Sequence, residues 1–212
     1  MGLKKVLLAS AAMLVGLAAT DTAQAGGVYG TFSGGLNWTD GIKATGPSTT
    51  VNTSADTGFV VSVAVGWHLD DIVMKGLRVE LEGAYRHNNQ PGTGVISSTS
   101  GVTQTTSTWS VMGNVWYDFD MGGRLRPYFG GGIGWARDKF IPKPFAGAPT
   151  VENEGFAWQA GAGLNVMLTP DASVGLGYRY MDTDGYGSTP AGTDLGDATH
   201  SSVVFTINYN LN

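Results

Sequence analysis

The chain of 212 residues contains no cysteine. A disulfide framework, a catalytic thiol and a cysteine-bound metal are therefore excluded. Charged residues are scarce, at 14% of the chain, and the net charge of −5 argues against a nucleic acid as partner. The three histidines have no ligand-like spacing. We therefore expect neither a metal site nor a cofactor.

Long apolar runs are absent after residue 25. The first 25 residues contain Lys4 and Lys5, a short apolar stretch over 6–19 and the small-x-small sequence Ala23-Gln24-Ala25. This is the pattern of a cleavable signal peptide, and the apolar stretch is shorter than the roughly 20 residues that a spanning helix needs. We expect residues 1–25 to be removed and residues 26–212 to form one domain. No later run is long enough for a helical membrane protein.

Eight stretches of the chain alternate apolar residues with polar or small ones. In one of them, Val61 and Val63 alternate with Ser62 and Ala64. Successive side chains of a strand point to opposite faces, so each stretch predicts a strand with one apolar face and one polar or small face. The predicted strands cover residues 27–38, 57–69, 76–87, 107–119, 125–137, 154–168, 172–182 and 199–211.

The connections between these strands alternate in length. Three are short and carry turn signals such as Gly122-Gly123 and Pro170-Asp171. The other four run for 16–19 residues and are rich in Ser, Thr, Gly, Asn and Pro. Short periplasmic turns and long outer loops are typical of outer-membrane barrels. We predict an all-β fold, an eight-stranded antiparallel up-and-down transmembrane β-barrel, with periplasmic termini and extracellular long loops.

Aromatic residues on the outward face fall near the two ends of the predicted strands. A bilayer with two interfaces selects two such belts, whereas the alternative, a soluble sandwich or calycin-type barrel with an aromatic core, gives no reason for them. The predicted outer belt is Trp38, Tyr85, Trp109, Trp135, Trp158 and Tyr180. The predicted inner belt is Trp67, Tyr117, Phe119 and Tyr209.

Polar and charged residues occupy the inward face. An eight-stranded barrel is just wide enough to be filled by side chains, so we predict an interior network of ion pairs and hydrogen bonds. Glu80 and Glu82 could instead form a catalytic carboxylate pair, or the charges could gate a pore. The flanking arginines favour ion pairing. The predicted lumen network is Arg78, Glu80, Glu82, Arg86, Asn114, Asp118, Arg126, Tyr128, Gln159 and Arg179.

One further arrangement requires a test. His200 and Ser202 lie two apart on a predicted strand and could act as base and nucleophile. No third orienting group is marked in the sequence, and a G-x-S-x-G elbow is absent. The simpler interpretation is a rim histidine beside solvated serines. We predict no catalytic residues.

Several segments together resemble a known family. They are Leu77–Arg86, Asn114–Phe119, Arg126–Gly134, Gly177–Tyr180 and the strand that begins at His200-Ser201. In order and spacing they are similar to the small eight-stranded outer-membrane barrels called porin-family or opacity-like surface proteins, which are related to the barrel of OmpA-type proteins. Tyr209 fits the aromatic ending of that family, but Leu211-Asn212 depart from it.

The resemblance implies a structural or surface role in a Gram-negative outer membrane, such as membrane integrity, adhesion or surface antigen, and no enzyme activity. A narrow diffusion pore is the first alternative and a lipid-modifying barrel enzyme the second. The expected partners are outer-membrane lipid and lipopolysaccharide. Periplasmic chaperones and the barrel-assembly machinery would act during biogenesis, and a host or surface ligand on the outer loops stays open.

Overall fold

The computed structural model describes residues 27–40, 43–46, 49–52, 56–70, 72–92, 102–143, 151–184, 194–195 and 198–211. The expected signal peptide, residues 1–25, lies outside the described residues. Within these ranges, no helix has the length and apolar character to cross a membrane.

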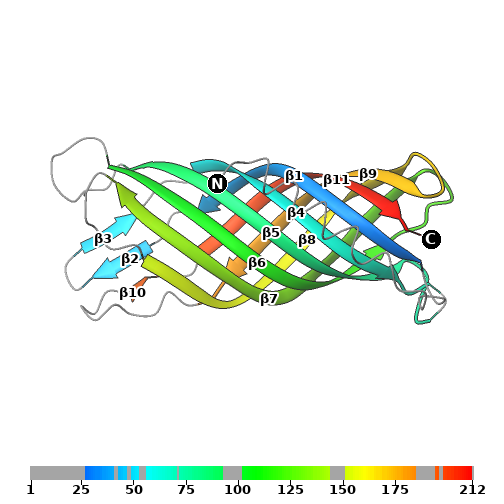
Figure 1. The fold of residues 1–212 in the computed structure, drawn as a ribbon, viewed down its shortest axis with the longest axis horizontal. Coiled ribbons are helices and arrows are strands. Elements are labelled where there is room, and N and C mark those ends of the chain that lie inside the picture. Colours follow the sequence, from blue (N-terminus) through cyan, green and yellow to red (C-terminus); the bar gives the residue numbers. More distant parts are fainter. Residues whose placement is uncertain are drawn as a thin grey trace.

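Eight strands close into an antiparallel barrel, in which each strand pairs with its neighbours along the chain and β1 pairs with β11. Figure 1 shows the strands tilted steeply across the long axis of the molecule. Closure gives every strand two partners, so no sheet edge is left with unpaired backbone groups. The predicted fold class is confirmed. The barrel strands are β1 (Val28–Asp40), β4 (Asp56–His68), β5 (Leu77–Gly92), β6 (Val102–Asp118), β7 (Leu125–Lys143), β8 (Val151–Met167), β9 (Ala172–Thr183) and β11 (Ala198–Asn210).

At the end with the long connections the barrel wall extends further than the alternation predicted. β7 reaches Lys143 rather than residue 137, and its pairing with β8 continues to Phe140↔Val151. The wall here contains Thr and Ser, which accept strand geometry without following an apolar alternation. Apolar periodicity therefore marks the apolar-walled part of each strand and misses its polar extension.

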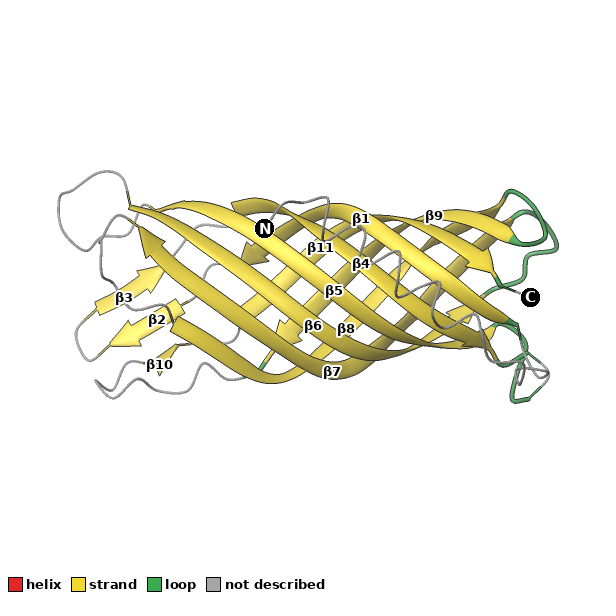
Figure 2. Cartoon of the chain, in the orientation of Figure 1, coloured by secondary structure: helices red, strands yellow, loops and turns green. Residues whose placement is uncertain are grey.

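A second sheet lies beyond this end of the barrel, in connections that were expected to be loops. Its strands are β2 (Lys43–Gly46), β3 (Thr49–Asn52) and β10 (Asp194–Leu195), in the order β10-β2-β3. Figure 2 shows it at the opposite end of the molecule from the turns that join β4 to β5, β6 to β7 and β8 to β9. The strands are too short to have produced a periodic signal in the sequence.

The two faces of the barrel wall have opposite character. On β5, Leu81 is 59% exposed on the outside, whereas its chain neighbours Glu80 and Glu82 are 4% and 1% exposed. The same alternation runs through Val111, Ile133, Leu176 and Phe205, all exposed apolar residues on the outer wall. The wall is apolar outside and polar inside, which is the reverse of a soluble barrel.

Candidate functional site

The interior of the barrel is the candidate site, and all ten residues of the predicted lumen network face it. Eight of them are buried: Arg78, Glu80, Glu82, Arg86, Asn114, Tyr128, Gln159 and Arg179. Asp118 and Arg126 line a cavity of about 480 Å³ at the short-turn end of the barrel, which we call the vestibule. The side chains form three groups along the bore.

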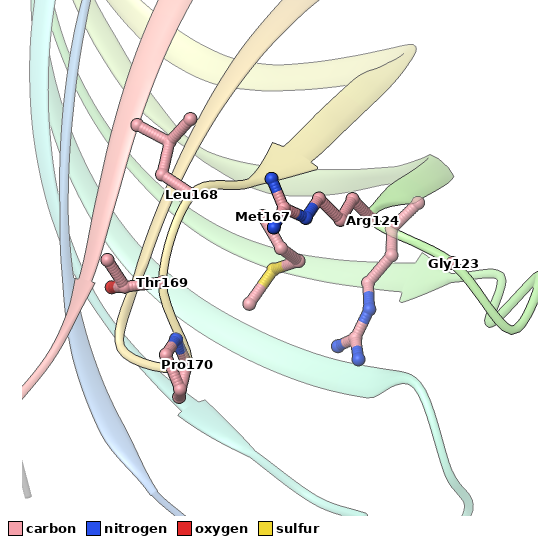
Figure 3. Close-up of a pocket in the computed structure, with 7 residues that line it drawn as sticks. Gly123, Arg124, Met167, Leu168, Thr169 and Pro170 are labelled. Atoms are coloured by element: carbon pink, nitrogen blue, oxygen red, sulfur yellow. The ribbon is translucent and has the colours of Figure 1, made fainter.

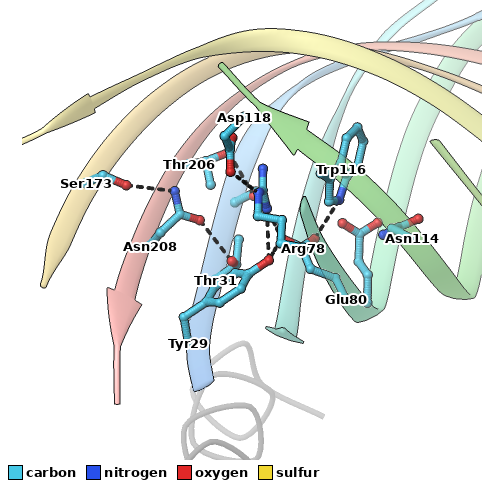
Figure 4. Close-up of polar contacts among 12 residues, drawn as sticks. Tyr29, Thr31, Arg78, Glu80, Asn114, Trp116, Asp118, Ser173, Thr206 and Asn208 are labelled. Atoms are coloured by element: carbon cyan, nitrogen blue, oxygen red, sulfur yellow. Dashed lines mark hydrogen bonds and ion pairs between the residues drawn. The ribbon is translucent and has the colours of Figure 1, made fainter. Parts of the chain in front are cut away.

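The first group, the Arg78 cluster, borders the vestibule, which Tyr29, Arg78 and Asp118 line, and Figure 4 shows its polar contacts. The Arg78 guanidinium donates to Asp118 Oδ2 at 2.7 Å, to the Tyr29 hydroxyl at 3.0 Å and to Glu80 Oε1. Tyr29 also donates to Glu80 Oε1 at 2.8 Å, and Trp116 Nε1 donates to Glu80 Oε2 at 2.9 Å. One carboxylate thus gathers three donors, which is how a buried charge escapes the cost of desolvation.

Aromatic rings surround the Arg78 guanidinium. Its carbon lies 5.7 Å from the ring centre of Tyr29, 5.8 Å from that of Trp116 and 5.4 Å from that of Tyr128. Cation–π attraction adds to the ion pairs at such distances. Sequence reasoning assigned neither Tyr29 nor Trp116 to the lumen, although both have inward parity and are 1% exposed. Parity was the signal that could have identified them.

Two of these rings fit only because glycines face them. A Cβ atom at Gly66 would lie 2.3 Å from the Tyr29 ring, and one at Gly177 would lie 2.2 Å from the Tyr128 hydroxyl. Both distances are far shorter than a van der Waals contact. These inward glycines make room for bulky side chains from other strands.

The second group, the Glu82 cluster, crosses the middle of the bore. Arg179 on β9 donates to Glu82 Oε2 on β5, and Gln159 donates to Glu82 Oε1 at 3.3 Å and to Asn114 Oδ1 at 2.6 Å. Glu80 and Glu82 therefore have different donors and do not share a proton as a catalytic pair would. This arrangement favours ion pairing over the carboxylate-pair interpretation.

The third group, the Asn37 cluster, is uncharged and was not predicted. Asn37 donates to Asn88 Oδ1 at 2.7 Å and accepts from the Ser202 hydroxyl at 2.7 Å. His200 Nδ1 lies 3.2 Å from the Thr39 hydroxyl. His200 and Ser202 are 1% and 2% exposed, so the expected rim histidine beside solvated serines is wrong: both residues have inward parity. Inside the bore they are out of reach of membrane lipid.

Buried charges also approach this group. The Thr108 hydroxyl donates to Asp138, whose Oδ1 lies 4.0 Å from His200 Nε2. Arg86 donates to the Ser110 hydroxyl at 2.9 Å. Asp138 was missed because its strand was expected to end one residue earlier. The sequence therefore underestimated how far the polar interior extends.

Arg126 differs from the other predicted lumen arginines. Across the described ranges its side chain makes neither a hydrogen bond nor an ion pair, and its Nε is buried. The other three arginines donate within the bore, whereas Arg126 stands at the barrel end beside the vestibule. The prediction that Arg126 is paired within the interior network is therefore wrong for the described residues.

The aromatic residues assigned to belts lie on the outer wall. Near the long-connection end, Tyr85 packs against Trp109 with ring centres 4.7 Å apart, and Trp158 packs against Tyr180 at 5.5 Å. Trp109 and Trp135 are 56% and 43% exposed, and Trp38 is half-buried. The wall continues past these rings on β6 and β7.

At the short-turn end, Tyr117 contacts Phe119 at a ring distance of 4.9 Å, and both contact Phe129. Trp67 and Tyr209 lie one residue before the ends of β4 and β11. All are outward-facing. Their placement is compatible with the belt proposed from the sequence.

A polar group on the outer wall offers the arrangement nearest to a serine–histidine pair. The His87 Nδ1 lies 3.0 Å from the Ser107 hydroxyl and 3.4 Å from the Tyr85 hydroxyl. In the described part of the chain no carboxylate bonds His87, so the orienting third group is missing. Among the same residues, no group of three or more His, Asp or Glu could hold a metal.

Comparisons with known proteins agree with this architecture. The family model of the outer membrane protein beta-barrel domain matches residues 7–210. An uncharacterized protein of Brucella abortus is 27% identical over 149 residues, which cover 60% of this chain and 52% of that protein. The chain thus spans about half the length of the curated relatives it matches.

Solved structures are similar to this chain at low sequence identity. Neisserial surface protein A superposes with a TM-score of 0.57 at 14% identity, over 86% of this chain and 96% of that one. OprG of Pseudomonas aeruginosa gives a TM-score of 0.49 at 13% identity, over 88% and 98%. Since the family model spans nearly the whole chain and the strands close into a barrel, this chain belongs to the outer membrane protein β-barrel family of the bacterial outer membrane.

Proposed function

We propose that this barrel serves the outer membrane as a structural and surface-exposed protein, with a role in membrane integrity, in adhesion or as a surface antigen. The observation that carries the proposal is the filled bore. Side chains of different strands bond inside it at three levels, in the Arg78, Glu82 and Asn37 clusters, and the Arg179–Glu82 ion pair joins opposite walls of the bore. A bore occupied in this way leaves the surface as the working part of the molecule.

The proposed orientation puts the three short turns and both barrel termini in the periplasm, with the long connections outside. The outward rings near each end support a barrel that spans the bilayer, because amphipathic rings prefer the two membrane interfaces, and the alternation of short and long connections supports this direction. Lipid and lipopolysaccharide would contact the apolar wall. Chaperones and the assembly machinery would act during biogenesis, and any host ligand would meet the long connections.

A planar-bilayer recording tests the filled bore. We expect the purified barrel to give no stable large conductance steps, because the vestibule leads to the Arg78 cluster rather than to a channel. Steps of the size seen with wide porins would overturn the proposal and favour the diffusion pore.

Proteolysis of intact cells, with mapping of the cuts, tests the orientation: cuts should fall in the four long connections only.

The lipid-modifying enzyme receives little support from the geometry. His200 and Ser202 are enclosed in the bore, and the outward His87–Ser107 pair lacks an orienting carboxylate in the described residues. We expect cells that carry Ser202→Ala or Ser107→Ala to retain the lipid A profile of the wild type. A changed profile would restore the enzyme as a candidate.

A further inference from the structure

A second cavity, of about 320 Å³, lies between two short turns at the end of the barrel where β7 begins and β8 ends (Figure 3). The backbone N–H of Met167 donates to the Arg124 carbonyl at 2.8 Å and ties the two turns together. We call this cavity the turn pocket. It is lined by Gly123, Arg124, Arg126, Met167, Leu168, Thr169 and Pro170.

The turn pocket is lined by two guanidinium groups and by no carboxylate. Arg124 lies in the bend directly before β7 and Arg126 is the second residue of that strand, and both line the same cavity. Across the described residues, neither side chain makes a hydrogen bond or an ion pair. Two cations without partners, side by side at a cavity, are arranged to receive an anion.

A hydroxyl group completes the donor set. Thr169 Oγ1 accepts from the backbone N–H groups of Asp171 and Ala172, at 3.3 and 3.0 Å. Its acceptor capacity is occupied, and its own O–H is left to donate. The acidic residues of this region, Asp70, Asp118 and Asp171, line the adjoining vestibule, which Arg126 also lines, and Asp118 is held by Arg78.

The outer side of the pocket is apolar and faces away from the bore. Leu168 lines the pocket and is 56% exposed. Leu125 and Val166, which pair across β7 and β8, are 44% and 39% exposed beside it. Arg126 has the inward parity of β7 and also lines the vestibule, and Arg124 is exposed in the bend before the strand, so the pocket lies at the rim between the mouth of the bore and the membrane-facing wall.

We propose that the turn pocket binds the phosphate of an anionic phospholipid in the adjoining leaflet. The guanidinium forks and the Thr169 hydroxyl would hold the phosphate oxygens, and the acyl chains would lie against Leu125, Val166 and Leu168. This proposal rests on the membrane placement given under the proposed function. It assigns to this barrel a fixed lipid at the short-turn end.

The test uses the whole barrel reconstituted in phosphatidylcholine nanodiscs that contain a minority of phosphatidylglycerol. Lipids retained on the protein are counted by native mass spectrometry. Arg124→Gln/Arg126→Gln removes the two cations, and Arg137→Gln/Lys139→Gln removes the same charge at the other end of the barrel as a matched control. Unboiled gel mobility shows that each variant is folded.

We expect wild type and control to retain phosphatidylglycerol in preference to phosphatidylcholine, and the Arg124/Arg126 variant to lose about tenfold or more of that preference. Equal retention in all three proteins would overturn the proposal. Inorganic phosphate, titrated against the barrel in phosphatidylcholine discs, forms the second arm. Saturation by phosphate without any lipid preference would overturn the lipid assignment. Failure to enter nanodiscs at all would instead contradict the membrane placement.

Discussion

The outer wall and the bore of this barrel are built by alternate residues of the same strands, yet they follow opposite rules. Leu81 faces outward at 59% exposure, while Glu80 and Glu82 beside it are buried among donors. In a soluble barrel the pattern is reversed. The comparison teaches that stability on the two faces has different sources: hydrocarbon solvation outside, and ion pairs and hydrogen bonds between side chains inside.

The largest effect should come from breaking the Arg78 cluster. Arg78→Leu leaves Asp118 and Glu80 without their guanidinium in a buried site, so we expect a loss of about 3–5 kcal/mol in the free energy of unfolding. Urea titration in lipid vesicles, followed by tryptophan fluorescence, measures it. The heat-resistant mobility of the unboiled barrel should also decrease. Unchanged stability would contradict the role of the interior network.

On the outer wall, adding a cation should destabilise the barrel, whereas in the bore removing one does. Ile133→Arg puts a cation on a residue that is 63% exposed on the apolar side, and we expect a loss of about 2–4 kcal/mol near the bilayer midplane. Val63→Arg should behave alike. Ile133→Leu serves as the control and should fold into vesicles like the wild type. Equal folding of the arginine variants would show that the facing assignment is wrong.

The uncharged Asn37 cluster should be of intermediate importance. Asn37→Ala removes the hydrogen-bond partner of the Asn88 side-chain oxygen Oδ1 and of the Ser202 hydroxyl, and both of these residues are buried. Leaving such groups unpaired costs about 1–3 kcal/mol. The same urea titration applies, and Ser202→Ala, which removes only one donor, should cost less. A larger loss for Ser202→Ala than for Asn37→Ala would contradict the central position of Asn37.

The smallest effect is expected at the mouth of the bore. Asn208 accepts from Thr31 at 2.9 Å and donates to Ser173 at 3.1 Å, but it lines the vestibule and is only half-buried. Water can replace these bonds, so Asn208→Ala should cost less than about 1 kcal/mol. A loss as large as that of Asn37→Ala would mean that the vestibule is not open to water.

Much of this could be predicted because strand parity is local. Alternation alone assigned Glu80, Glu82 and Arg179 to the inside and Ile133 to the outside. It could not place polar segments: the extension of β7 past residue 137 and the small sheet β10-β2-β3 lack apolar periodicity. Partner choice was also out of reach. Tyr29, Trp116 and the Asn37 cluster meet their partners on adjacent or next-but-one strands of the barrel, over sequence separations of 36 to 165 residues.

Tryptophan quenching compares the two faces most directly, because Trp158 lies on the outer wall and Trp116 in the bore. Two single-tryptophan variants, each with the other five tryptophans replaced by Phe, are reconstituted in vesicles with brominated lipid, and acrylamide is added in a second series. We predict strong quenching of Trp158 by brominated lipid, and little quenching of Trp116 by either agent. Equal quenching of both residues by brominated lipid would contradict the arrangement of an apolar outer wall around a filled polar bore.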